Sequence, residues 1–291
     1  MDAPVTVITG ANSGIGRSTA VHLATAGHTV IGTVRAASKA EKLLAMATES
    51  GCEVHLVELD VADDASVTNG MAEVLERFGR VDHLVNNAGV GGNGVVEECS
   101  TEQYASVLNV DLLGVIRCAQ AVLPQMRARG SGTIVNISSV VGRFAAPAQA
   151  PYTAAKWALE GVSEQMAMEL APFGIRVAIV EPGVTKSAIF AKNIDAPNDT
   201  GAYDAHYRRM FGFYGTGIPN ATDPLEVAQI VRHAIETDDP QLRYLVSWGA
   251  AEIANGRDQM ADADWVALGA SEDDAEYRRR FHDLFGLDLD I

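Results

Sequence analysis

Short runs of apolar and β-branched residues alternate with longer amphipathic stretches over the first two-thirds of the chain. The apolar runs predict strands at residues 5–9, 29–34, 53–58, 81–85, 133–137 and 176–180. Between them, apolar residues recur at helical spacing near residues 14–26, 38–49, 63–78, 101–129 and 152–171. Apolar strands that alternate with helices are typical of βαβ units around a buried parallel sheet. The pattern therefore predicts an α/β fold: a doubly wound parallel sheet of the Rossmann type, with three layers.

The regular alternation stops after Pro182-Gly183. Residues 186–223 have little periodicity, and we expect them to form a lid over a substrate site. A helix near 224–235 and a strand near 242–248 follow. The acidic extension at about 250–291 carries Tyr277, Phe281 and Phe285 at helical spacing, which predicts a helix that packs on the body. No repeat or linker interrupts the sequence, so residues 1–291 are expected to form a single domain.

Composition narrows the function classes. The hydrophobic content of 47% is typical of a soluble globular protein, and the formal net charge of −16 argues against a broad surface for nucleic acid or anionic membranes. No apolar run approaches the roughly 20 residues of a membrane span, and no signal peptide is expected. Cys52, Cys99 and Cys118 are few, odd in number and far apart, which indicates reduced thiols and a cytoplasmic protein. The histidines show no metal-ligand spacing, so no metal is expected.

A glycine-rich stretch, "TGANSGIG", directly follows the first predicted strand. Gly10 permits a tight turn, and Gly14 and Gly16 allow a ligand to approach the backbone closely. Free amides at the start of the next helix would face a pyrophosphate. The alternative is a strand-to-helix turn without a ligand.

Four further motifs lie at or just beyond the carboxyl ends of predicted strands, where open α/β sheets bind ligands. They are "NNAG" at 86–89, "NISS" at 136–139, "YTAAK" at 152–156 and "EPGVTKS" at 181–187. Together with the glycine loop, they occur in the order and at the intervals found in the short-chain dehydrogenase/reductase superfamily. Over residues 5–183 the chain resembles the compact oxidoreductase branch of that superfamily. Its later part is weakly similar to the hydroxysteroid and retinol dehydrogenase relatives.

The resemblance implies a nicotinamide cofactor bound by residues from several motifs. The phosphates and ribose would be held by Gly10, Asn12, Ser13, Gly14, Ile15 and Gly16. The adenine and its ribose would be bordered by Asp60, Val61, Asn87, Ala88 and Gly89, and the nicotinamide end by Tyr152, Lys156, Pro182, Gly183 and Thr185. Asn86 is expected to have a structural role, tying neighbouring strands together.

The chemistry is expected at Tyr152 and Lys156, which lie four positions apart and so share one helix face. A neighbouring ammonium lowers the pKa of a tyrosine from about 10 and prepares it to exchange a proton with a substrate oxygen. The resemblance implies that Ser139, with Ser138 as second choice, bonds the substrate oxygen, and that Asn109 holds a water against the lysine. Each residue taken alone also fits a structural role.

Arg35 bears on the choice of nicotinamide. In the resembled family an acidic residue at the end of the second strand selects NAD, whereas here Val34 takes that place and Arg35 follows. An arginine forms charge-assisted hydrogen bonds with a 2′-phosphate. NADP(H) is therefore favoured, with NAD(H) possible. The alternative for Arg35 is a solvated cation.

The sequence thus predicts an NADP(H)-dependent oxidoreductase that interconverts a carbonyl and a secondary alcohol, acting on a hydrophobic small-molecule substrate of sizeable dimensions. The rival hypothesis is a nicotinamide-binding redox sensor without turnover. A homodimer or homotetramer is expected through the helices that start near Thr101 and Tyr152. The lid aromatics would either line an apolar substrate pocket or anchor the lid on the body; they are Phe190, Tyr203, Tyr207, Phe211, Phe213 and Tyr214.

Overall fold

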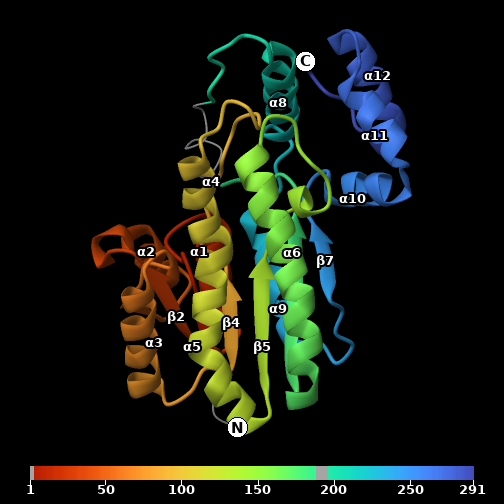
Figure 1. The fold of residues 1–291 in the computed structure, drawn as a ribbon. Helices are drawn as coiled ribbons and strands as arrows, with labels where there is room; N and C mark the ends of the chain where they lie inside the picture. The colour runs from red at the N-terminus through yellow and green to blue at the C-terminus, as the bar shows by residue number, and fades with distance from the viewer. Residues whose placement is uncertain (1–2, 188–195) are drawn as a thin grey trace.

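A seven-stranded parallel sheet forms the centre of the molecule (Figure 1), as the computed structural model shows for residues 3–187 and 196–291. The strand order is β3-β2-β1-β4-β5-β6-β7, and every neighbouring pair is parallel. The strands are β1 (Val5–Ile8), β2 (Thr29–Val34), β3 (Val54–Glu58), β4 (His83–Asn86), β5 (Gly132–Ile137), β6 (Ile175–Pro182) and β7 (Arg243–Val246). The predicted doubly wound sheet is confirmed.

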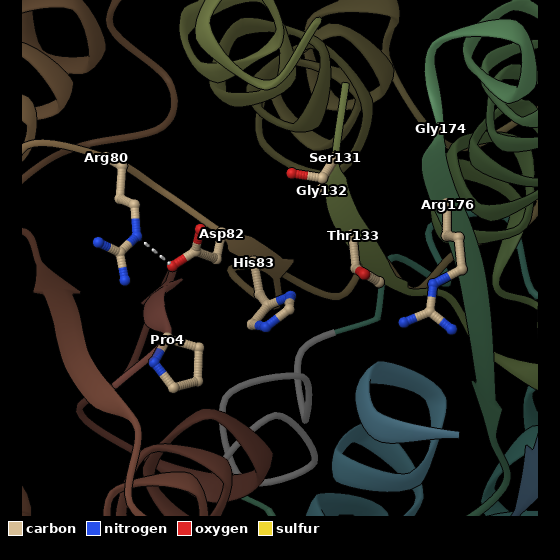
Figure 2. A pocket seen from close by; sticks show the side chains of 9 residues that line it. All are labelled: Pro4, Arg80, Asp82, His83, Ser131, Gly132, Thr133, Gly174 and Arg176. Carbon is tan, nitrogen blue, oxygen red and sulfur yellow. Dashed lines mark hydrogen bonds and ion pairs between the residues drawn. The ribbon is translucent and has the colours of Figure 1, made fainter. Parts of the chain in front are cut away.

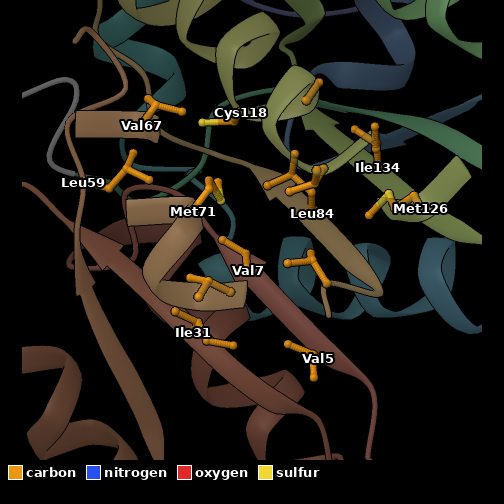
Figure 3. Close-up of a cluster of buried hydrophobic side chains, with 14 of the residues drawn as sticks. Val5, Val7, Ile31, Leu59, Val67, Met71, Leu84, Cys118, Met126 and Ile134 are labelled. Carbon is orange, nitrogen blue, oxygen red and sulfur yellow. The ribbon is translucent and has the colours of Figure 1, made fainter. Parts of the chain in front are cut away.

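Helices cover both faces of the sheet, because the strands are apolar on both sides. Sheet residues such as Val7 and Leu84 pack with Met71 and Cys118 on one face (Figure 3), beneath α3 (Asp64–Phe78), α5 (Gly114–Arg129) and α6 (Ala150–Leu170). A second cluster fills the other face, beneath α1 (Gly14–Thr25), α2 (Glu41–Glu49) and α9 (Pro224–Glu236). The three predicted layers are therefore present.

The helix over Thr101–Arg129 contains an irregularity that positions the site. It consists of α4 (Thr101–Leu108), a π-helical turn (Asn109–Leu113) and α5. The Ser100 hydroxyl and the Gln103 side chain form a capping box at its start.

By length and composition alone, Thr101–Arg129 could cross a membrane, although core helices of soluble proteins pass the same test. Its inner face packs on the sheet through Cys118 and Met126.

The expectation that residues 186–223 lack regular structure is wrong for one part of the segment, where α8 (Asp204–Gly217) forms. The Tyr207 hydroxyl donates to Glu98 at 2.7 Å, and the ring of Phe213 lies 5.9 Å from that of Trp248. These two rings therefore anchor the segment on the body, whereas Phe211 is 46% exposed. Phe190 lies outside the described residues.

The acidic extension folds onto the body as predicted, in three helices: α10 (Ala250–Gln259), α11 (Asp262–Gly269) and α12 (Asp274–Phe285). Phe281 and Phe285 of α12 are buried in a cluster with Phe213 of α8. Buried Arg209 of α8 places its guanidinium over the Tyr277 ring, 4.4 Å from the centroid, and donates to the carbonyl of Ser271 at 2.9 Å. The extension and α8 consequently form one packed unit above the carboxyl edge of the sheet (Figure 1).

Candidate active site

The sequence motifs meet at the carboxyl edge of the sheet, because parallel strands end at the same side. The loop after β1 lies beside the loop after β4, and the adjacent ends of β5 and β6 carry Ser139 and Pro182. Helix α6 enters this edge with Tyr152 and Lys156 in its first two turns. Ligands bind at this edge in open α/β sheets.

The glycine loop has the backbone shape of an anion cradle. Gly10 and Gly14 adopt φ values of +67° and +51°, which side-chain-bearing residues rarely adopt. A Cβ on Gly16 would lie 2.3 Å from Asn87 Nδ2 and 2.6 Å from the Gly10 carbonyl oxygen. The Ser13 side chain makes no cap hydrogen bond at the N-terminus of α1, and the first amides of a helix can bind an anion. This geometry fits the pyrophosphate of a dinucleotide.

Thr9 holds the glycine loop against the end of β4, a role that the sequence did not reveal. Its hydroxyl accepts from the backbone N–H groups of Asn87 and Ala88 at 2.9 and 3.0 Å. The Asn87 amide in turn donates to the Thr9 carbonyl at 2.9 Å. Asn86 has the expected structural role: it is buried and donates to Asn136 of β5 at 2.9 Å.

The residues predicted to border the adenosine lie beyond the ends of three strands: Arg35 follows β2, Asp60 and Val61 follow β3, and residues 87–89 follow β4. Arg35 is exposed and makes no ion pair among the described residues. Asp60 accepts from the backbone N–H of Ala62 at 3.0 Å, and Val61 is buried beside Gly114 of the long helix. A cation at the end of β2 is thus available to a ligand.

Tyr152 and Lys156 lie on the same face of α6, as their spacing predicts. The Lys156 ammonium is 5.4 Å from the centre of the Tyr152 ring and donates to the Ile137 carbonyl at 3.2 Å. The lysine side chain is only 7% exposed. Its charge is therefore held at the end of β5, next to the phenol.

The structure does not bring Asn109 to Lys156, which corrects the expectation from the sequence. The Asn109 amide donates to the Ala62 carbonyl at 3.1 Å. Asp111 takes the place beside the lysine instead, with its Oδ2 3.2 Å from Lys156 Nζ. The reason is the π-helical turn, which holds an extra residue per turn and so changes which side chain faces α6. The sequence signal that could have identified Asp111 is an acidic residue inside the apolar run "NVDLLGV".

Of the two candidate serines, Ser139 lies closer to the chemistry. Its hydroxyl accepts from the Val141 N–H at 3.2 Å and donates to the Pro182 carbonyl at 3.4 Å. The Ser138 hydroxyl is buried and has no hydrogen-bond partner among the described residues. The Ser139 hydroxyl lowers the pKa of Tyr152, whereas Ser138 does not contribute to it.

Burial decides the pKa of Tyr152, against the expectation that Lys156 would lower it below the usual value. Burial raises the pKa of the phenol, Lys156 opposes this, and Asp111 raises it further, so that the net direction is upward. The pKa of Lys156 is also raised, because Asp111 and then Tyr152 outweigh the lowering caused by burial. The structure therefore favours a protonated tyrosine beside a protonated lysine.

The segment after β6 is fixed by the strand that follows it. A Cβ on Gly183 would lie 2.1 Å from the Trp248 carbonyl oxygen, so only glycine fits there. The Thr185 hydroxyl lies 2.7 Å from that of Ser247. This segment starts beside Ser139, whose hydroxyl donates to the Pro182 carbonyl at 3.4 Å.

Above Tyr152 the site is walled by α8 and by the loop after β4. The Tyr214 hydroxyl donates to the Asn93 side-chain oxygen at 3.0 Å, and the proximity of Tyr152 contributes to a raised pKa of Tyr214. Val141 and Phe213 belong to the same apolar cluster as Tyr152 and Tyr214. The surroundings of the phenol are therefore largely apolar, with one polar pair.

A separate cavity of about 380 Å³ lies at the amino edge of the sheet and takes no part in this site (Figure 2). It is lined by the starts of β4, β5 and β6, including His83 and Arg176. Arg80 donates to Asp82 at 2.9 Å beside it. The two edges of the sheet thus carry different kinds of polar cluster.

Comparisons with known proteins identify the family of the chain. A family model described as short chain dehydrogenase matches residues 4–198. The chain is 35% identical over 256 residues to the uncharacterized oxidoreductase YusZ of Bacillus subtilis, covering 86% of this chain and 91% of that protein. It is 38% identical over 257 residues to 17-beta-hydroxysteroid dehydrogenase type 1 of Mus musculus, covering 84% and 74%.

Solved structures give the same result. A short-chain dehydrogenase from Streptomyces avermitilis matches with a TM-score of 0.79 and 35% identity, over 94% of this chain and 99% of that one. Two further similar structures hold a nicotinamide cofactor. They are a variant of the actinorhodin polyketide ketoreductase with NADPH (TM-score 0.72, 31% identity, 84% and 96% covered) and a protein from Burkholderia phymatum with NAD (0.73, 27%, 83% and 89%). The chain therefore belongs to the short-chain dehydrogenase/reductase family, whose members are NAD(P)-dependent oxidoreductases that act on CH–OH and C=O groups.

Proposed function

We propose that this protein interconverts a carbonyl and a secondary alcohol with NADP(H), and that Tyr152 is its acid/base. The observation that carries the proposal is the cluster of Tyr152, Lys156 and Ser139 beside an uncapped glycine cradle at one edge of the sheet. A sensor without turnover would need the cradle but not the cluster.

The cofactor, when bound, supplies or accepts the hydride. The loop of Gly10, Asn12, Ser13, Gly14, Ile15 and Gly16 would hold its phosphates and ribose. Asp60, Val61, Asn87, Ala88 and Gly89 would border the adenine and its ribose. Pro182, Gly183 and Thr185 would border the nicotinamide, and the Lys156 ammonium would donate to the nicotinamide ribose. The geometry of the cradle and the fixed Gly183 support these roles.

In carbonyl reduction, the Ser139 hydroxyl holds the substrate oxygen and the Tyr152 phenol donates a proton to it. Hydride adds to the carbonyl carbon, so that one proton and two electrons convert the carbonyl into the alcohol. Lys156 stabilises the tyrosinate that is left, because its ammonium is held beside the ring. Oxidation runs the same steps in reverse.

The preference for NADP(H) rests on Arg35. Its guanidinium is exposed at the end of β2, where Val34 is buried and carries no charge that would repel a 2′-phosphate. An arginine at this place forms charge-assisted hydrogen bonds with that phosphate.

The substrate is apolar around its reacting carbon. Phe213 and Tyr214 of α8, together with Val141 in the turn after β5, form an apolar wall with Tyr152. An apolar site with few polar groups suits a hydrophobic ketone or secondary alcohol. Residues 196–223 of the predicted lid therefore act as a substrate wall that Tyr207 and Phe213 anchor on the body.

The protein acts as a cytoplasmic homodimer or homotetramer, joined through the helices over Thr101–Arg129 and α6. Leu113, Trp157 and Met168 on these helices are 42%, 48% and 76% exposed, which leaves apolar surface for a second copy. A monomer mass in light scattering at micromolar concentration would contradict this assembly.

The test is an activity assay on a panel of hydrophobic ketones and secondary alcohols. The absorbance of the reduced nicotinamide is monitored, and the phosphorylated and unphosphorylated cofactors are compared in parallel. We expect turnover that is faster with NADPH and is lost in Tyr152→Phe. Tight NADPH binding with no turnover across the panel would favour the redox sensor.

A further inference from the structure

The one acidic side chain that contacts the cluster of Tyr152, Lys156 and Ser139 belongs to Asp111, among the described residues. Its Oδ2 lies 3.2 Å from Lys156 Nζ, and the two side chains are 0% and 7% exposed. This oxygen has no hydrogen-bond partner besides the lysine among the described residues. The pair is therefore a buried, closely matched ion pair rather than a surface contact.

The backbone holds Asp111 in this position from two sides. The π-helical turn Asn109–Leu113 directs it toward α6, and its Oδ1 accepts from the Val90 N–H at 2.8 Å. Val90 directly follows the "NNAG" motif at the end of β4. The carboxylate is thus bonded to the loop after β4, which lies beside the glycine loop.

We propose that Asp111 is a positioning residue that neutralises Lys156 and so keeps Tyr152 protonated, which sets the enzyme for carbonyl reduction near neutral pH. The proposal rests on the function proposed above and adds the preferred direction of the reaction. Reduction consumes a proton from the phenol, whereas oxidation requires a tyrosinate that can accept one.

A count of charges gives the reason. Lys156 and Asp111 cancel, so loss of the phenol proton would leave one net negative charge in a buried cluster, which is costly. With an amide at position 111, the same loss would take the cluster from one positive charge to zero. The carboxylate therefore opposes ionisation of Tyr152, in agreement with its upward effect on the pKa of that residue.

The other groups that face the cluster leave this count unchanged. Ser139 and Tyr214 are neutral hydroxyls beside Tyr152. Glu160, one turn after Lys156, also acts on the lysine, but it pairs with Arg243, which Glu164 and Glu181 share, and it does not contribute to the pKa of Tyr152. Asp111 is consequently the charge that decides the state of the phenol.

The test is a spectroscopic titration of tyrosinate in the full-length protein without cofactor or substrate. The signal of Tyr152 is the difference between the wild type and Tyr152→Phe, and the same difference is taken in the background of Asp111→Asn. We expect the midpoint to fall by roughly 1–3 pH units in the amide background, the range that a neighbouring charge produces. An unchanged or higher midpoint would overturn the proposal.

Two further variants complete the design. Asp82→Asn makes the same change of charge in an ion-paired aspartate at the opposite edge of the sheet and should leave the midpoint in place. Asp111→Ser, which is also neutral and is smaller than the amide, replaces Asp111→Asn in the comparison if the amide variant does not fold.

Activity separates this inference from the proposed function. With an active substrate, Asp111→Asn should move the alkaline requirement of alcohol oxidation to lower pH by the same amount as the titration. A shifted titration without turnover on any substrate would refute the proposed function but not the role of Asp111 as counter-charge. Turnover with an unmoved midpoint would refute the role of Asp111 alone.

Discussion

The two edges of the same sheet use charge in different ways. At the amino edge, Asp82 accepts from Arg80 and from the Val5 N–H, and Arg176 donates to the carbonyls that end α9. These groups tie the strand starts to their surroundings. At the carboxyl edge, Lys156 and Asp111 pair with each other beside a phenol, and glycines leave the backbone open. Charged groups at the amino edge therefore hold the strand starts in place, whereas those at the carboxyl edge set the protonation state of Tyr152.

The largest effect is expected from Tyr152→Phe, which removes the transferable proton and leaves the ring. Turnover should fall by roughly 10²–10⁴-fold, the usual contribution of general acid–base catalysis, while the affinity for NADPH stays nearly unchanged. Steady-state kinetics and fluorescence titration measure the two quantities. Substantial residual turnover would remove Tyr152 from the acid/base role and weaken the contrast between the edges.

At the amino edge, His83 should make the free energy of unfolding depend on pH. Burial, with a contribution from His28, lowers the pKa of His83 from 6.5 to about 4, so the folded state resists protonation that the unfolded state accepts. The stability present above pH 6.5 is then lost as pH falls toward 4, by up to about 3 kcal/mol. Denaturant unfolding across this range should show a steeper loss of stability on acidification in the wild type than in His83→Gln, because the other titrating groups are common to both proteins. Parallel curves for the two proteins would refute the assignment.

Arg35→Ala tests whether a charged side chain at the carboxyl edge contributes to cofactor binding rather than to the stability of the fold. The affinity for NADPH should weaken by about 1.5–3 kcal/mol, the range of a hydrogen bond to a charged group, with NADH little affected. Isothermal titration with both cofactors measures this. The free energy of unfolding should stay constant because Arg35 is exposed. A wild type that prefers NADH would show that the assignment is wrong.

The smallest effects are expected from alanine substitutions at two glycines, one in the glycine loop and one in α6, and are measured as changes in the free energy of unfolding. In Gly16→Ala the new methyl group would meet Asn87 and Gly10 closer than 3 Å, which should cost about 1–3 kcal/mol of stability and weaken NADPH binding. Gly161→Ala in α6 meets nothing within 4 Å and should stabilise the helix by about 1 kcal/mol. Equal effects of the two changes would mean that the loop has no close backbone contact.

Much of the fold was predictable because its signals are local. Each strand is a short apolar run, so the six strands before Pro182 and the one after it were placed within a few residues of their observed bounds. The glycine loop, Ser139, Tyr152 and Lys156 were found because each stands at a strand end or a helix start. Helix α8 was missed because its residues follow no clear period, and contacts from Tyr207 to Glu98 and from Arg209 to the C-terminal extension stabilise it instead.

The sequence by itself determined the order of the elements, the edge at which the motifs meet, and the glycine cradle, because these follow from periodicity and from the short spacing of residues along the chain. Only the tertiary structure decided that Asp111 rather than Asn109 faces Lys156, since a π-helical turn changes the facing side chain without any change in apolar pattern. It also decided the upward pKa of Tyr152, which depends on burial and on a carboxylate 41 positions away in the chain. Electrostatic environment is a sum over neighbours in space, and the packing of α6 against that turn supplies those neighbours.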